Sequence, residues 1–229
     1  MSTQYWVNGD ATREKMNLPT ERNLVLQKAI NAIRPIPEKI YMKREVLISL
    51  FIMLLGLALG YIAKITDSIS MIGEIGTDLG IWVFIVSLIV AFSHTPVTAA
   101  INAPVFFLSM FASYYLYGHL VLGFFPRAYF IGWLVVSLLS PIGGLIVWFS
   151  RGKGWIANVC AALPISVLFA WGYPAFYTYR IPLVFDLLYA VVLMIVLTKT
   201  WRGKAITFVI SCVLAFIIVQ SRMLSYLPW

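Results

Sequence analysis

Charge is scarce in this sequence. Of its 229 residues, 11% are Asp, Glu, Lys or Arg, and only 9 residues are acidic. A soluble domain usually has about 25% charged residues. Hydrophobic residues make up 61% of the chain, which is more than a water-soluble fold of this size can bury and far more than a disordered chain contains. The composition excludes both classes and predicts an integral membrane protein.

Residues that form disulfides or bind metals are also few. The two cysteines, Cys160 and Cys212, lie inside apolar runs, where a thiol usually acts as a small hydrophobic group. The two histidines, His94 and His119, are predicted at opposite faces of the membrane, which excludes a bis-His haem and a two-His metal site. The turn that contains His94 is expected to cap a helix rather than to catalyse a reaction. We therefore expect no cofactor and no metal.

Motifs for catalysis and for nucleotide hydrolysis are missing as well. The sequence has no His-Glu-x-x-His, no Gly-x-Ser-x-Gly and no Walker motif. No lysine lies in the last apolar run, which argues against a retinal protein. An enzyme is therefore less favoured, and energy for any transport would come from an ion gradient or from another subunit.

Long apolar runs are what the chain has in abundance. A membrane helix needs about 20 apolar residues, and the bilayer leaves backbone groups no partner outside the helix itself. The runs predicted to be transmembrane helices are 46–65, 75–92, 97–117, 128–149, 155–173, 182–198 and 205–221. The expected fold is an all-α integral membrane protein with a bundle of about seven transmembrane helices. Residues 1–44 form a polar N-terminal segment, and residues 45–229 form a single transmembrane domain.

The N-terminal segment contains one predicted helix and no apolar stretch typical of a cleavable signal peptide. Thr20 is a candidate N-cap, an imperfect apolar stripe runs from Leu24 to Ile33, and Pro35 ends the helix. Such a helix could lie in the cytoplasmic interface of the membrane. A short helix tucked under the bundle fits the same pattern.

The distribution of Lys and Arg predicts the orientation of the chain. With the N-terminus inside, the inner segments carry Lys28, Arg34, Lys39, Lys43, Arg44, Arg151, Lys153, Lys199, Arg202 and Lys204, and the outer ones carry Lys64, Arg127, Arg180 and Arg222. Cytoplasmic loops are enriched in basic residues. We therefore expect the N-terminus inside, the C-terminus outside and a bacterial-type cytoplasmic membrane. The net charge of +8 is then explained by basic residues at the inner face of the membrane. We therefore expect the lipid bilayer as a partner and no nucleic acid.

The acidic residues beyond the first apolar run are the best candidates for a site. Asp67, Glu74, Asp78 and Asp186 are all predicted at the outer side. An ionisable group inside a membrane helix is costly, so Asp186 should face the bundle and hold a partner, with Arg180 or Arg127 in reach. No second carboxylate is expected beside it.

Other residues at the same level extend this candidate site. Glu74 and Asp78 are four apart and should share a helix face. The predicted outward-facing site consists of Asp186, Arg180, Arg127, Glu74, Asp78, Tyr177 and His119. A structural ion pair at Asp186, acids at a helix start and an ordinary aromatic belt are the alternatives for these residues.

Two functions from different classes follow. The first is a component that transports or binds a small solute or an ion, with an outward-facing polar and aromatic site. The second is a non-catalytic membrane subunit or assembly scaffold, with another membrane protein or a second copy of the chain as partner. An intramembrane enzyme is the least favoured because no nucleophile and base stand out. The solute is not indicated.

Overall fold

The computed structural model describes residues 21–37, 41–67, 69–123, 125–178 and 180–221, and only the backbone at 21–26, 70–72, 77 and 122. Thr20 and the C-terminal residues 222–229 lie outside the described part of the chain. Within it the protein is helical and has no strand. The helices are α2 (Glu21–Ile33), α3 (Met42–Thr66), α4 (Ser70–Thr77), α5 (Leu79–Ala91), α6 (Pro96–Leu122), α7 (Arg127–Phe149), α8 (Gly154–Gly172), α9 (Ala175–Thr178), α10 (Ile181–Leu197) and α11 (Trp201–Gln220).

Five helical segments in the described chain are long and apolar enough to cross a membrane. They are α3, α6, α7, α8 continued through α9, and α11. Two further apolar helices are shorter, with 13 residues in α5 and 17 in α10. At about 1.5 Å per residue, α5 is only about 20 Å long. The fold fits a multi-pass membrane protein.

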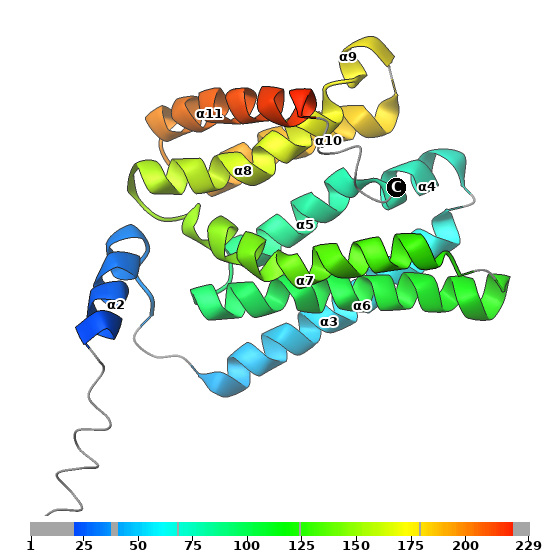
Figure 1. The fold of residues 1–229 in the computed structure, drawn as a ribbon, viewed down its shortest axis with the longest axis horizontal. Coiled ribbons are helices and arrows are strands. Elements are labelled where there is room, and N and C mark those ends of the chain that lie inside the picture. The colour runs from blue at the N-terminus through cyan, green and yellow to red at the C-terminus, as the bar shows by residue number, and fades with distance from the viewer. Residues whose placement is uncertain (1–20, 38–40, 68, 124, 179, 222–229) are drawn as a thin grey trace, which may run out of the picture.

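The long helices form two groups with α5 between them (Figure 1). In one group α6 packs against α3 and α7, and in the other α8 packs against α10 and α11. Helix α5 contacts α6, α7, α8 and α10. One cluster of buried side chains joins Val90 and Ala91 of α5 to Trp148, Ile165 and Leu193. A second cluster joins Trp82 of α5 to side chains of α3 and α6. Helix α5 is thus the centre of the bundle.

Small residues set the spacing between α3 and α6. Gly56 and Gly60 are buried. A Cβ atom on Gly60 would overlap the backbone oxygen of Met110 and lie 2.9 Å from its carbonyl carbon. The two helix backbones are therefore in direct contact at this position.

One predicted helix is wrong. The run 75–92 forms two helices, α4 and α5, with Asp78 between them in an extended conformation, φ −71° and ψ 142°. Glycine and aspartate favour helix ends, and Gly73, Gly76 and Asp78 fall in this stretch. The other predicted runs each form one helix with bounds shifted by a few residues. Helix α11 begins at Trp201, so Lys204 lies in its first turn.

The turn between α5 and α6 has the predicted capping role. Thr95 is the N-cap of α6, with its hydroxyl accepting from Thr98 N at 3.0 Å, while Thr95 N donates to Thr98 Oγ1 at 3.1 Å. This reciprocal pair is a capping box.

We expect Thr95→Ala to lower the stability of the protein by about 1 kcal/mol, because it removes the cap of the longest helix. Thermal unfolding in detergent micelles measures the change. Thr178→Ala is the matched control, since that exposed hydroxyl only donates back to Pro174 O. Equal melting temperatures for the two variants would mean that the cap contributes nothing.

Candidate functional site

The interruption between α4 and α5 brings Asp78 into the bundle. Asp78 precedes the first residue of α5, and Trp171 of α8 donates its indole Nε1–H to Asp78 Oδ1. A carboxylate at a helix N-terminus faces the positive end of the helix dipole. Both features favour the ionised form of Asp78.

Asp186 of α10 is the most deeply buried acid in the described chain, with 1% of its surface exposed. Neither of its carboxyl oxygens has a hydrogen-bond partner among the described residues. Two glycines make room for it. A Cβ atom on Gly80 of α5 would overlap Asp186 Oδ1, and one on Gly172 of α8 would lie 3.0 Å from Asp186 Cβ. The carboxyl group is thus enclosed where α5, α8 and α10 meet.

The carboxyl groups of Asp78 and Asp186 are close enough to interact with each other. The expectation of a solitary acid at Asp186 is therefore wrong. It failed because the broken helix turns Asp78 toward α10. Two ionised carboxylates are both acceptors. A hydrogen bond between the two carboxyl groups would therefore require a proton on one of them.

The predicted ion pair at Asp186 is not formed in the described structure. Arg180 instead pairs with Glu74, at 3.1 Å between Nη2 and Oε2, with about half or more of each side chain exposed. Arg127, at the start of α7, is exposed and forms no ion pair with a described residue. Since an exposed ion pair contributes little stability, the Arg180–Glu74 pair does not offset the burial of Asp186.

Three further predictions about this end of the bundle have mixed outcomes. Glu74 and Asp78 do not share a helix face, because the helix breaks between them. Tyr177 is exposed and its ring contacts that of Tyr173. His119 is exposed beside Phe125. The structure therefore brings Asp186 and Asp78 together, while the observed contacts of Tyr177 and His119 are elsewhere.

Two contributors to the carboxyl pair are not among the site residues predicted from the sequence. One is Trp171, whose indole donates to Asp78. Tyr189, three residues beyond Asp186 on α10, is close enough for both acids to affect it electrostatically, and its ring stacks on Phe84 at 4.8 Å. Asp186 and Tyr189 are three residues apart and so lie on one face of the helix, and this spacing is the sequence feature that indicates Tyr189.

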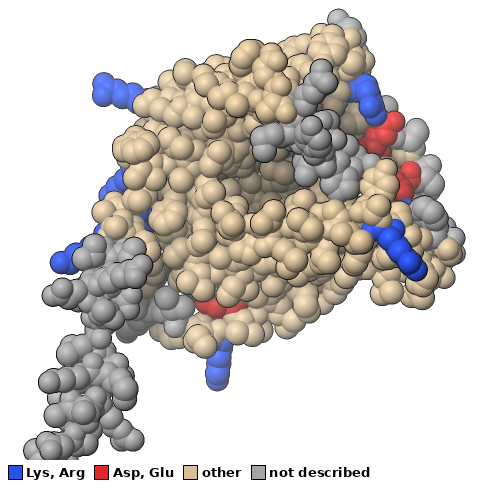
Figure 2. Space-filling view, in the orientation of Figure 1, with Lys and Arg blue, Asp and Glu red and all other residues tan. Residues whose placement is uncertain are grey.

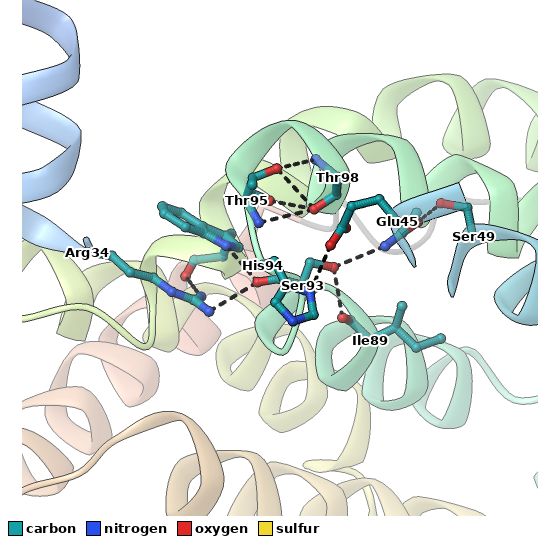
Figure 3. Close-up of polar contacts among 10 residues, drawn as sticks. Arg34, Glu45, Ser49, Ile89, Ser93, His94, Thr95 and Thr98 are labelled. Atoms are coloured by element: carbon teal, nitrogen blue, oxygen red, sulfur yellow. Dashed lines mark hydrogen bonds and ion pairs between the residues drawn. The ribbon is translucent and has the colours of Figure 1, made fainter. Parts of the chain in front are cut away.

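A second polar cluster lies at the other end of α5 (Figure 3). Ser49 donates to Asn102 Oδ1 at 2.7 Å, and Asn102 donates to Ser93 Oγ at 3.2 Å. His94 Nδ1 is 3.2 Å from Glu45 Oε1, a pairing that the sequence did not reveal. The hydroxyl of Ser93 donates to Ile89 O. No hydrogen bond joins the Ser93 and His94 side chains in this part of the described chain; Ser93 Oγ contacts Ile89 O and Asn102, and His94 contacts Glu45.

Arg34 ties the N-terminal segment to this cluster. Its guanidinium donates to the backbone oxygens of Trp148 at 2.5 Å, Ala91 at 3.0 Å and Ser93 at 3.2 Å. It also lies over the Trp148 ring, 4.3 Å from the centroid. Burial, and then the charge of Arg151, lower the pKa of Arg34 to about 10, so it stays charged at neutral pH.

Helix α2 itself is held against the bundle. Ile33 O accepts a hydrogen bond from Lys153 N at 2.8 Å, and Ile30 packs on the buried cluster around Trp148. The helix runs across the direction of the long helices (Figure 1). This arrangement fits a short helix packed under the bundle. It fits a helix in the plane of the membrane equally well, because such a helix also runs across the long helices.

Metal ligands do not gather in the described structure. Among the residues that it covers, no group of three or more His, Cys, Asp and Glu side chains could hold a metal ion. Cys160 and Cys212 are free thiols, as their apolar surroundings predict.

Comparisons with protein-family models, with curated proteins and with solved structures give no match for this chain.

Proposed function

We propose that the protein is a membrane transport component that binds a small solute or an ion at the interruption between α4 and α5. The observation that carries the proposal is the carboxyl group of Asp186, which is buried without a hydrogen-bond donor among the described residues and is adjacent to Asp78. Acids inside a membrane protein mark ion and substrate pathways. Discontinuous helices that meet at polar groups are a recurring feature of transporter sites.

The proposed membrane arrangement has seven crossings, with the N-terminus inside and the C-terminus outside, in a bacterial-type cytoplasmic membrane. The crossings are α3, α4 with α5, α6, α7, α8 with α9, α10 and α11. Basic residues near the Arg34 end support this orientation. Acids gather at the opposite end, near α4 (Figure 2). The carboxyl pair then lies toward the outer side.

The surface supports access from within the bundle. Figure 2 shows the visible face hollowed over α5, between α8 and α7. Trp171, which donates to Asp78, is partly exposed. At Trp171 and Asp78, a solute with an aromatic ring or a positive charge would meet an indole and a carboxylate together.

Asp186→Asn tests the proposal in full-length protein reconstituted into liposomes. Uptake of radiolabelled cations and aromatic solutes is compared with wild type, and thermal unfolding is measured on the same samples. A hydrogen bond that involves a charged group contributes about 1.5–3 kcal/mol, so loss of the Asp186 carboxyl group should reduce uptake by about tenfold or more. The melting temperature should change little, because asparagine has the same shape.

Asp67→Asn is the matched control, because it makes the same change at the same end of the bundle. Asp67 is more exposed and pairs with Lys64 at 2.8 Å. Its uptake should equal that of wild type. The proposal is wrong if Asp186→Asn lowers the melting temperature while uptake per folded molecule is unchanged, since Asp186 would then be only structural.

The docked N-terminal helix supports a second function, that of an assembly subunit. Gln27, Lys28 and Asn31 of α2 are exposed although Arg34 anchors the segment. They would offer a surface to a partner protein. Deleting residues 1–33 leaves Arg34 in place, and purification in mild detergent then compares partners with the full chain. A stoichiometric partner lost on deletion favours this function, and an identical set of proteins argues against it.

A further inference from the structure

The environment of the two acids is incompatible with two negative charges. Two adjacent carboxylates repel strongly in a medium that contains little water, and a buried charge without a partner is costly. No cation offsets them among the described residues, because Arg180 is paired with Glu74 at the surface. One carboxyl group must therefore carry a proton or share a bound cation.

The contacts of the two acids differ. Asp78 accepts the indole hydrogen of Trp171 and lies at the N-terminus of α5, and both features stabilise an anion. Asp186 lies within α10 and has no described donor. When environments differ in this way, the anion forms at the better solvated acid and the other acid stays neutral.

From this geometry we propose that Asp186 is a proton-binding site, in which its protonated carboxyl donates a hydrogen bond to ionised Asp78. The inference deepens the proposed function, on which its role in transport rests, by naming the proton as the coupling ion. One proton on the pair leaves a single negative charge, and the two oxygens that face each other become donor and acceptor.

Other groups around the pair do not replace this proton. From α4, Glu74 is occupied by Arg180 of the α9–α10 connection. Helix α5 has no titratable side chain between Leu79 and Ala91. On α8, the group that reaches the pair is the indole of Trp171, which does not titrate. Tyr189 of α10 is a neutral phenol at physiological pH.

Loss of the proton would have a mechanical effect. Gly80 of α5 and Gly172 of α8 lie directly against Asp186, so the backbones of both helices are in close contact with it. Two adjacent anions would therefore push α10 away from α5 until water or a cation entered. Proton exchange and opening of the site would thus be one event.

Infrared spectroscopy of the full-length protein in liposomes detects the proton directly. A protonated carboxyl has a carbonyl stretching band that ionised carboxylates lack, and this band shifts in D₂O. We expect wild type at neutral pH to show such a band, Asp186→Asn to lose it completely and Asp67→Asn to keep it. If Asp186→Asn does not fold, wild type labelled with ¹³C-aspartate should show the band displaced.

Two results would overturn the inference. One is the absence of any protonated-carboxyl band that depends on Asp186 or on the aspartate label. The other is a rise in melting temperature of wild type, but not of Asp186→Asn, when NaCl, KCl or MgCl₂ is added, which would assign the site to a metal cation. If the site binds a proton, the Asp186→Asn variant should have the same melting temperature as wild type, because the asparagine amide also donates a hydrogen bond to Asp78.

The infrared result does not depend on transport. If the infrared band depends on Asp186 but the protein moves no solute, the proton-binding site is supported and the proposed function is wrong. A pH-sensitive dye trapped in the liposomes tests the coupling. Proton entry with wild type should exceed that with Asp186→Asn, and equal rates would contradict a coupling role.

Discussion

Replacing Gly60 with alanine is expected to lower the free energy of unfolding strongly, because the added methyl group has no space between α3 and α6. The new Cβ would overlap Met110 O and lie 2.9 Å from the Met110 carbonyl carbon. Both atoms belong to the backbone of α6, so no change of side-chain conformation can relieve the overlap. Helix α3 must move away from α6. Inserting a group into a well-packed core costs about 1–3 kcal/mol, and we expect the upper end of that range.

Thermal unfolding and the yield of folded protein measure this effect, with Gly143→Ala as the matched control. Gly143 is exposed on α7, and a Cβ there would meet no atom within 4 Å. Alanine favours a helix over glycine by about 1 kcal/mol, so the control should be neutral or slightly stabilised. If both variants unfolded at the same temperature as wild type, the backbones of α3 and α6 would not be in close contact at Gly60.

Replacing Arg34 with alanine is expected to release the N-terminal segment. The guanidinium donates to three backbone oxygens at the ends of α5 and α7 and packs on Trp148. A hydrogen bond from a charged group contributes about 1.5–3 kcal/mol, and the substitution also removes this donor from Ala91 O and Trp148 O, while Ser93 O keeps the indole of Trp148. Helix α2 should therefore detach although the bundle stays folded.

Limited proteolysis of the protein in detergent reports this release. Cleavage between α2 and α3 should become at least about tenfold faster in Arg34→Ala, which corresponds to about 1.4 kcal/mol. Lys28→Ala is the control, since Lys28 is exposed on the same helix. Arg34→Lys should be intermediate, because an ammonium group cannot reach several carbonyls as a planar guanidinium does. Equal cleavage of all variants would show that Arg34 does not hold the segment.

The bundle was predictable because its helices follow from a local requirement. A run of about 20 apolar residues can satisfy its backbone in lipid only as a helix. The interruption at Asp78 was not predictable from hydropathy alone, because the run continues through it without a proline. The stretch Gly73–Gly80 carries the relevant propensities, but glycine also occurs in uninterrupted membrane helices.

The candidate site was only partly predictable. The scarcity of acids identified Asp186 and Asp78 as unusual residues. Their proximity depends on how α10 packs against α5, which no local pattern in the sequence specifies. For the same reason Arg34 was predicted only as one of several inner basic residues. Its contacts are with the backbone oxygens of helix ends, which any residue type could provide.

The short length of α5 has an electrical consequence. If α5 alone fills the apolar layer in the proposed crossing of α4 with α5, the membrane potential falls there over about 20 Å instead of the about 30 Å of a typical bilayer core. The local field is then about 1.5 times steeper. Moving one elementary charge through the full potential is worth about 2.3 kcal/mol per 100 mV. In the proposed arrangement, a proton that binds Asp186 from the outer side would cross part of this field, so occupancy of the carboxyl pair would depend on voltage as well as on pH.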